Sequence, residues 1–562
     1  MNDLKACIVQ RDRTVLLECA HPGFEAAREK LARFAELVKS PSAFHTYRIT
    51  PLSLWNAAAL GCTAEDIAAD LESIARWGLP AGLLQEIRGL VSRYGKLMLE
   101  READGEGDAL CLTAADSRLL DEAIASPALS ELMLDRISPV QARISAAARG
   151  RLKQELMRYG FPVLDLAGYH EGQALRLQWQ NGGEGKPFAL RSYQTEAVEA
   201  FEGVTGSGGS GVLVLPCGAG KTIIGIAALE RQQCECLILT SNTTSVEQWI
   251  RELTEKTTLK PDQVGQYTGE RKEVKPVTVA TYQILTHRRS KEGEFEHMKL
   301  FNERNWGLII YDEVHLLPAP VFRATAEIQA TRRLGLTATL VREDGCEQDV
   351  FSLIGPKRYE MPWKELEAKG WIARVECSEI RVPMDAALRE KHAYAEGKEK
   401  FRLAAENPGK TAIVADLLKR HPQGGVLVIG QYLDQLQALA AAIGAPFISG
   451  RTPQRQRTAL FASFRKGDTP VLVVSKVANF AVDLPDASVA IEVSGSFGSR
   501  QEEAQRLGRI LRPKAGDNRA YFYTLVTENS KEEEFAVKRQ MFLVEQGYEY
   551  AVHSAREVRS GT

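Results

Sequence analysis

The sequence has no excess of charge of either sign, since 71 Lys and Arg residues stand against 73 Asp and Glu residues, for a net charge of -2. This balance excludes a polybasic protein that coats nucleic acid, so any nucleic-acid site must be a local patch. The nine cysteines form no CxxC pair, and neither a zinc ribbon nor a four-cysteine iron–sulfur cluster is expected. Their odd, scattered arrangement fits a reducing compartment.

Long apolar runs are also missing. No stretch approaches the roughly 18 apolar residues that cross a bilayer, and the N-terminus lacks a basic region followed by an apolar one. We therefore expect a cytoplasmic protein with no membrane partner. With 562 residues, of which 44% are hydrophobic and 26% charged, the chain is long enough to bury several cores. At about 150 residues per domain, three to four domains are predicted.

The first zone, residues 1–185, reads as mostly helical. Thr63 to Asp66 resembles a capping box before an amphipathic segment. Residues 143–159 predict another helix, which Gly160 and Pro162 end. The glycine-rich stretch 181–185 is typical of a domain boundary.

From residue 186 onward, short β-branched runs alternate with helical segments, which is typical of α/β folds with buried parallel sheets. One series of predicted strands covers 212–215, 237–240, 277–281, 308–311 and 334–337. A second series, after about residue 362, covers 426–429, 447–449, 471–474, 489–493 and 521–526. The pattern predicts two tandem α/β layers, and residues 205–211 a flexible surface loop within the first.

A phosphate-binding loop is predicted between a strand and a helix, over Leu215-Pro216-Cys217-Gly218-Ala219-Gly220-Lys221-Thr222. Glycines let main-chain N–H groups wrap phosphates, Lys221 supplies charge, and Thr222 supplies a hydroxyl for Mg²⁺. Leu215 stands where the general pattern has its first glycine. A glycine-rich strand-to-helix turn is the alternative, and Cys217 is interpreted as a small filler residue.

An acidic pair, Asp312 and Glu313, follows the predicted strand 308–311. A nucleotide hydrolase needs such a pair at the end of a buried strand, with Asp312 in the magnesium shell and Glu313 activating the attacking water. A helix N-terminal acidic cluster is the alternative. The phosphate loop in the same sheet favours the hydrolase.

Basic residues in the second α/β layer share one predicted helix face. Gln505, Arg509 and Arg512 are spaced by four and three residues, so they can reach one target. Two arginines aimed at a phosphoryl group can act as arginine fingers. A solvated basic helix is equally compatible with this motif alone.

In this order, these motifs resemble those of superfamily 2 helicases over about residues 186–526. The resemblance rests on Arg191-Ser192-Tyr193-Gln194, the phosphate loop, Asp312 to His315, Thr337-Ala338-Thr339 and the segment from Gln505 to Arg512. The XPB branch is closer still. Arg342-Glu343-Asp344 follows the Thr337 motif as it does there, and Ser475-Lys476-Val477 leads to Asp483-Leu484-Pro485.

The resemblance implies a fold and a division into domains. Two tandem RecA-like parallel-sheet lobes would occupy residues 186–362 and 363–562, the second with a short helical insertion near 385–407. A mainly helical α+β domain would occupy residues 1–185. That region resembles the N-terminal domain of prokaryotic XPB proteins at His45 to Trp55 and Tyr159 to Val163.

The resemblance also implies roles for single residues in a site that takes ATP and Mg²⁺. Arg191 and Gln194 would serve ATP binding, Gln194 at the adenine, and the loop residues 216–222 would hold phosphate and metal. Catalysis would depend on Lys221, Asp312, Glu313, Gln505, Arg509 and Arg512. Coupling to DNA would pass through Thr337, Thr339 and Asp483.

DNA contacts and strand separation are implied for a further set: Thr240, Asn242, Thr244, Thr281, Arg342, Glu343, Asp344 and Lys476. The sequence departs from the eukaryotic and archaeal pattern at Ala478-Asn479-Phe480, where Gly-Asp-Thr follows Ser-Lys-Val, and this affects the contacts expected of that motif. The helical insertion would form either a DNA clamp or a solvated charged helix. In the N-terminal region, Arg143, Arg149, Arg151, Lys153 and Arg158 could form a basic DNA-facing surface or a solvated face.

The implied activity is an ATP-driven 3′-5′ DNA helicase that acts on single-stranded and duplex or forked DNA, in DNA repair. An RNA helicase is a second hypothesis, although Asp-Glu-Val-His and Thr-Ala-Thr differ from the DEAD-box motifs. A third is an ATPase clamp or assembly factor in a repair or transcription complex. A nuclease or a repair or transcription protein is an implied partner.

Overall fold

The structure is a computed structural model of the 562-residue chain. It describes residues 5–39, 43–102, 109–180, 188–203, 208–216, 218–288, 295–329, 331–338, 347–422, 425–475, 487–495, 510, 518–545, 548 and 550–560. Contacts divide the chain into two compact units. One holds Met1–Glu36, Thr46–Leu215 and Gly220–Met361, and the other holds Leu37–His45, Pro216–Ala219 and Pro362–Thr562.

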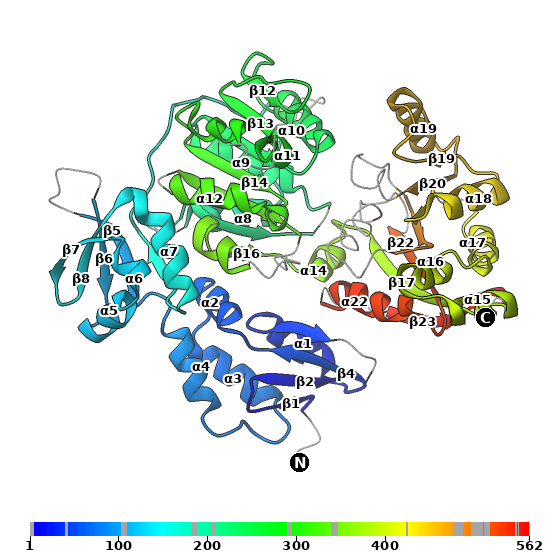
Figure 1. The fold of residues 1–562 in the computed structure, drawn as a ribbon, viewed down its shortest axis with the longest axis horizontal. Coiled ribbons are helices and arrows are strands. Elements are labelled where there is room, and N and C mark those ends of the chain that lie inside the picture. The colour runs from blue at the N-terminus through cyan, green and yellow to red at the C-terminus, as the bar shows by residue number, and fades with distance from the viewer. Residues whose placement is uncertain are drawn as a thin grey trace. The chain divides into compact units, whose positions relative to one another are not determined.

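The chain begins with a small sheet and four helices, drawn in blue in Figure 1. Its described strands are β1 (Cys7–Val9), β2 (Thr14–Glu18), β3 (Glu36–Lys39) and β4 (Phe44–Arg48), in the order β1-β2-β4-β3. The helices are α1 (Phe24–Ala32), α2 (Pro51–Ala59), α3 (Ala64–Ile74) and α4 (Leu83–Val91). The predicted capping box is confirmed, because the Asp66 N–H donates to Thr63 Oγ1 at 3.1 Å and the Thr63 N–H donates to Asp66 Oδ2 at 2.9 Å.

A second sheet follows, so the N-terminal region is α+β, as the resemblance implies, with more strands than its mostly helical pattern predicts. Among described residues its order is β7-β8-β6-β5-β9. Its strands are β5 (Leu97–Arg101), β6 (Ala109–Ala114), β7 (Met133–Ser138), β8 (Gln141–Ser145) and β9 (Val163–Asp165), with helices α5 (Ser117–Ile124), α6 (Pro127–Ser130) and α7 (Arg149–Arg158) and the 3₁₀ turn η1 (Ala146–Ala148). Residues 143–145, the start of the helix predicted over 143–159, belong instead to β8, which pairs with β6 and β7 on its two sides.

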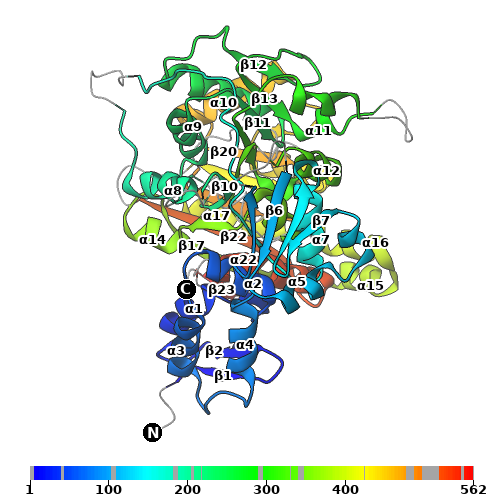
Figure 2. The same cartoon turned by 90° about the vertical axis from the view of Figure 1, so that its left-hand side faces the viewer.

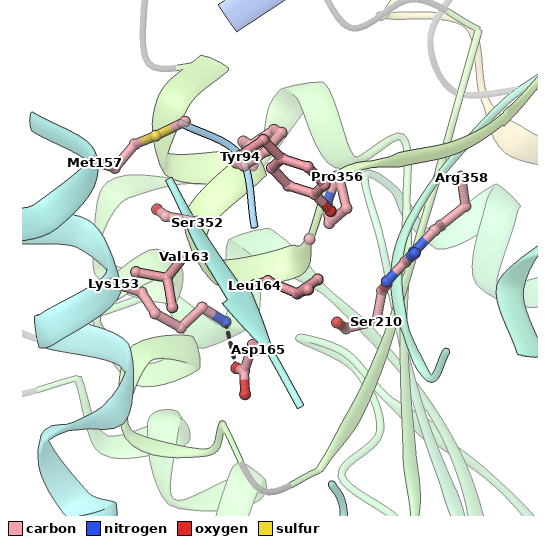
Figure 3. Close-up of a pocket in the computed structure, with 12 residues that line it drawn as sticks. Tyr94, Lys153, Met157, Val163, Leu164, Asp165, Ser210, Ser352, Pro356 and Arg358 are labelled. Atoms are coloured by element: carbon pink, nitrogen blue, oxygen red, sulfur yellow. Dashed lines mark hydrogen bonds and ion pairs between the residues drawn. The ribbon is translucent and has the colours of Figure 1, made fainter. Parts of the chain in front are cut away.

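Two basic side chains of α7, those of Arg149 and Lys153, are buried in the protein. Arg149 and Lys153 are 4% and 6% exposed, and both pair with Asp165, at 2.8 Å and 2.9 Å. Figure 3 shows Lys153 beside Asp165. Lys153 also donates to Gln329 Oε1 at 2.9 Å, across to the following α/β layer. Arg143 pairs with Glu102 and Asp135 instead. The predicted basic surface was therefore wrong for Arg149 and Lys153, whereas Arg151 and Arg158 are exposed.

The pKa values of Asp165 and Lys153 reflect both their burial and their pairing. Burial alone would raise the pKa of Asp165, but Lys153 and Arg149 outweigh it and keep that pKa well below its usual range. Burial lowers the pKa of Lys153 to about 8 in spite of its carboxylate partner. One carboxylate thus compensates two buried cations.

Replacing Asp165 with Asn should destabilise the protein by about 3–5 kcal/mol at pH 7, because Arg149 and Lys153 would stay buried without a counter-charge. The matched control is Asp135→Asn, which removes a partner that is 52% exposed and should cost no more than about 1 kcal/mol. Since the folded pKa of Asp165 lies below the unfolded value, its contribution is present above about pH 4 and is lost as the pH falls further. Urea unfolding at pH 7 and pH 3 should show the difference from wild type shrinking in acid. Equal losses for the two variants at pH 7 would contradict this role of Asp165.

Lobe 1 contains a parallel sheet whose described strands run in the order β12-β13-β11-β14-β15-β10-β16 (Figure 1 and Figure 2). They are β10 (Ser210–Val214), β11 (Cys236–Thr240), β12 (Val264–Tyr267), β13 (Val277–Thr281), β14 (Leu308–Asp312), β15 (Arg332–Thr337) and β16 (Lys357–Glu360). Helices α8 (Ser192–Glu202), α9 (Lys221–Gln232), α10 (Thr243–Lys256), α11 (Tyr282–Leu285) and α12 (Ala319–Glu327) accompany it, with η2 (Glu296–Asn302), η3 (Val314–Leu316), α13 (Glu347–Asp349) and η4 (Val350–Ile354). The central strands are buried along their whole length, as continuous apolar runs predict.

Lobe 2 repeats this architecture. Its described strands are ordered β19-β20-β18-β21-β22-β17-β23 and are all parallel. They are β17 (Arg374–Val382), β18 (Val426–Gly430), β19 (Phe447–Ile448), β20 (Val471–Ser475), β21 (Val489–Glu492), β22 (Arg519–Thr527) and β23 (Tyr550–Ser554). Helices are α14 (Trp363–Ala368), α15 (Ala386–Tyr394), α16 (Gly397–Ala405), α17 (Gly409–Arg420), α18 (Leu433–Ile443), α19 (Gln454–Lys466), α22 (Lys531–Glu545) and α23 (Ala555–Ser560). The predicted insertion forms α15 and α16.

The α/β fold class with two tandem parallel-sheet lobes is thus confirmed. In the described part of the chain, no helix is long and apolar enough to cross a membrane.

Candidate active site

The phosphate loop connects β10 to α9, as predicted. Gly218 and Gly220 have φ of +84° and +75°, a left-handed backbone that side chains other than glycine rarely adopt. Gly220 caps the N-terminus of α9, and Lys221 and Thr222 form its first turn. Main-chain N–H groups at this helix end and the Lys221 ammonium make the segment suitable for phosphate.

Gln194 lies against this loop. A Cβ placed on Gly220 would be 2.8 Å from Gln194 Nε2, so only glycine leaves room for the amide. The Gln194 Oε1 atom accepts from the Arg191 N–H at 3.0 Å, at the start of α8, and the side chain is buried. The structure therefore places the predicted Gln194 at the phosphate loop and Arg191 next to Gln194, at the N-cap of α8.

Asp312 ends β14, and three side chains from other elements hold it. The Trp249 indole N–H donates to its Oδ2 at 2.9 Å, and Thr240 Oγ1 donates to the same atom at 3.4 Å. The Tyr282 hydroxyl donates to its main-chain oxygen at 2.9 Å. Burial and the neighbouring Glu313 raise the pKa of Asp312 to about 6, whereas Trp249, Lys221 and Thr240 lower it.

Glu313 lies between a cation and an imidazole. Its Oε1 is 3.6 Å from Lys221 Nζ, and its Oε2 is 3.5 Å from His315 Nδ1. A hydrogen bond of 2.7 Å also joins His315 Nδ1 to Thr337 Oγ1 on β15. The side chains of Lys221, Glu313, His315 and Thr337 thus form one connected polar group at the carboxyl edge of the sheet.

The groups present fit Mg²⁺ bound together with a nucleotide. Among described residues, no cluster of three or more His, Cys, Asp or Glu side chains could hold a metal alone. Mg²⁺ typically takes one or two protein carboxylates and completes its shell with substrate phosphates and water. The partly buried Asp312 carboxylate and the Thr222 hydroxyl match this requirement.

Four residues for which the resemblance implies DNA contacts lie at the same carboxyl edge of the lobe 1 sheet. Thr240 and Thr281 are buried, and their hydroxyls are used inside lobe 1, since Thr281 Oγ1 accepts from the Ile284 N–H at 3.3 Å. Asn242 caps α10, with its Oδ1 accepting from the Ser245 N–H at 2.9 Å, and Thr244 lies in the first turn of that helix. Thr243 and Gln283, in the first turns of the helices that follow these strands, are exposed instead.

Ten predicted site residues lie outside the described part of the structure. They are Cys217, Thr339, Arg342, Glu343, Asp344, Lys476, Asp483, Gln505, Arg509 and Arg512. The Asn479 departure lies there as well.

Sequence reasoning missed Trp249 and Tyr282, the two aromatic residues that bind Asp312. Buried Trp and Tyr side chains usually find a hydrogen-bond partner, so both were detectable as polar groups in need of one. Their partner lies 63 and 30 residues away, and only the folded sheet identifies it.

Known proteins are similar along the whole chain. Residues 366–560 match the family described as "ERCC3/RAD25/XPB C-terminal helicase", residues 187–342 match "Type III restriction enzyme, res subunit", and residues 7–138 match "Helicase conserved C-terminal domain". The "DNA 3'-5' helicase XPB" of Kineococcus radiotolerans is 50% identical over 99% of this chain and 97% of its own length. The protein of that name in Mycobacterium tuberculosis is 50% identical over 98% of both chains. "General transcription and DNA repair factor IIH helicase/translocase subunit XPB/SSL2" of Saccharomyces cerevisiae is 31% identical over 96% of this chain and 71% of its own length.

Proposed function

Because the chain belongs to the XPB family of DNA 3′-5′ helicases, we propose that it hydrolyses ATP at the carboxyl edge of the lobe 1 sheet and uses the energy to move along DNA and open duplexes. The observation that carries this proposal is that Lys221, Asp312 and Glu313 lie together beside the phosphate loop, where only glycine fits at position 220. Hydrolysis needs this set, and a purely structural loop does not.

In this proposal each residue has a separate task. Gln194 contacts the adenine, and Gly218, Gly220, Lys221 and Thr222 hold the phosphates. Asp312 and Thr222 hold Mg²⁺, which neutralises charge on the departing phosphate when it is bound. Glu313 orients and deprotonates the attacking water, and Thr337 and Thr339 transmit the change. Arg509 and Arg512 sense the γ-phosphate.

DNA is the proposed nucleic-acid partner, held by its backbone along the segments around Thr240 to Thr244 and Thr281 and by the segment from Ser475 to Asp483. Backbone contacts carry no base information, so little sequence preference is expected. The yeast relative is named as a subunit of a transcription and DNA repair factor. We propose a repair role in the cytoplasm with a nuclease or a repair or transcription protein as partner.

The test measures ATP turnover in parallel without nucleic acid and with single-stranded DNA, duplex DNA, forked DNA and RNA. DNA should stimulate turnover more than RNA does, and a duplex with a 3′ single-stranded tail should be unwound in preference to one with a 5′ tail. Stronger stimulation by RNA would favour the RNA helicase. ATP-dependent DNA binding without unwinding would favour the clamp.

A further inference from the structure

The Trp249 side chain contacts the Asp312 carboxylate, which is the proposed Mg²⁺ ligand. It comes from α10, is 1% exposed, and donates its indole N–H to Asp312 Oδ2 at 2.9 Å. Thr240 Oγ1 donates to the same oxygen at 3.4 Å. Two donors on one oxygen restrict rotation of the carboxylate about its Cβ–Cγ bond.

The indole ring also contacts the helix that carries the phosphate loop. Gly225 lies in α9, one turn after Lys221, and a Cβ placed there would be 2.5 Å from Trp249 Cη2 and 3.3 Å from Leu336 Cδ1. Glycine at this position therefore leaves space for the indole. Trp249 thus fills the space between α9, which starts with Lys221, and the end of β14, which carries Asp312.

We propose that Trp249 is a positioning residue that sets the orientation of the Asp312 carboxylate for Mg²⁺ bound with ATP. The inference rests on the proposed ATPase site. An aromatic residue that only filled the core would need the ring but not its N–H, so the hydrogen bond is the feature to remove. A residue that orients a metal ligand typically changes metal affinity by about 10- to 100-fold when it is replaced.

The protein contains a matched control in the same lobe. Trp306 is also buried, at 2% exposed, and its indole N–H donates to the main-chain oxygen of Leu300 at 2.9 Å. Trp249→Phe and Trp306→Phe each remove one buried indole donor and keep an aromatic ring. Loss of core packing should therefore affect both variants, whereas only the first touches Asp312.

The experiment measures equilibrium binding of a fluorescent, non-hydrolysable ATP analogue to the full-length protein as Mg²⁺ is varied. Trp249→Phe should raise the half-saturating Mg²⁺ concentration by about tenfold or more, with affinity in EDTA unchanged. Trp306→Phe should leave the Mg²⁺ midpoint at the wild-type value. An unchanged midpoint in Trp249→Phe, or equal shifts in both variants, would overturn the inference.

Asp312→Asn separates failure of this inference from failure of the proposed site. If Asp312→Asn raises the Mg²⁺ midpoint and Trp249→Phe does not, Asp312 is a ligand that Trp249 does not position. If neither variant changes the midpoint, the assignment of Asp312 itself is wrong, and the inference falls with it.

A second pair of variants covers the case in which Trp249→Phe does not fold. Gly225→Ala should displace the indole and raise the Mg²⁺ midpoint, whereas Gly89→Ala, in α4 with no atom within 4 Å of the new Cβ, should not. A folded Gly225→Ala protein with the wild-type midpoint would count against the inference.

Discussion

Glu313→Gln should bind ATP normally and lose turnover by at least about a hundredfold, because a general base typically contributes a factor of 10² to 10⁴. The amide keeps the size of the side chain and can still accept a hydrogen bond, but it cannot take a proton from water. Lys221 and the glycine loop, which hold the phosphates, are unchanged. The backbone of Glu313 is also unusual, since its φ of +52° is a left-handed conformation that non-glycine residues seldom adopt.

The measurement compares DNA-stimulated ATP turnover with equilibrium binding of labelled ATP in the same preparations. Glu327→Gln is the matched control, because Glu327 is an exposed glutamate at the end of α12 in the same lobe. It should match wild type in both assays. Turnover close to wild type in Glu313→Gln would remove Glu313 from its proposed role, and loss of ATP binding would show that its pairing with Lys221 supports the loop instead.

The central strands of both sheets could be predicted because they are buried on both faces. All five strands predicted in the first layer lie within or overlap β10, β11, β13, β14 and β15. The missed strands contain polar residues. β12 reads Val-Gly-Gln-Tyr, β16 reads Lys-Arg-Tyr-Glu, and β17 alternates charged and apolar side chains. Such strands form because neighbouring strands pair with them, which a local pattern does not reveal.

The site divides in the same way. Lys221, Asp312 and Glu313 belong to short motifs, so their chemistry was visible in the sequence. Trp249 was not, because its role depends on the pairing of β11 with β14, which brings the helix after one strand to the end of the other. The start of α7 was misplaced for a similar reason. The predicted helix began at Arg143, but residues 143–145 belong to β8, which pairs with β6, and Arg143 pairs with Glu102, which follows β5.

The contacts of the N-terminal region make it part of lobe 1 rather than an independent module, because one compact unit holds Thr46–Leu215 together with Gly220–Met361. Trp55 and Met157 form a buried cluster with Phe351. The Tyr169 hydroxyl donates to Ser210 Oγ at 2.7 Å, and the Lys357 N–H donates to Asn56 Oδ1 at 3.1 Å. A further close approach is that of α7 to α12, where a Cβ on Gly150 would lie 2.2 Å from the main-chain oxygen of Ala326.

A protein that begins at Lys186 should therefore aggregate, or unfold at much lower temperature than the full-length chain. The truncation removes Trp55 and Met157, which would expose the apolar side chain of Phe351. It also removes Lys153, whose ammonium donates a hydrogen bond to Gln329. Soluble yield, thermal unfolding and basal ATP turnover of the two proteins measure the effect. A soluble truncated protein with full-length stability and turnover would show that the region folds as an independent module.

The cause can be tested without deleting anything. Gly150→Leu should separate α7 from α12 and lower the unfolding temperature in the intact chain, because the new side chain would meet the backbone of Ala326 rather than a movable side chain. Gly89→Leu places the same side chain in a helix with open space around it and should change the unfolding temperature little. If the truncated protein aggregates while Gly150→Leu matches Gly89→Leu, the region protects lobe 1 through the Trp55 cluster and not through the α7 contact. If Gly150→Leu alone is destabilised, the close packing of α7 on α12 is what makes the N-terminal region part of lobe 1.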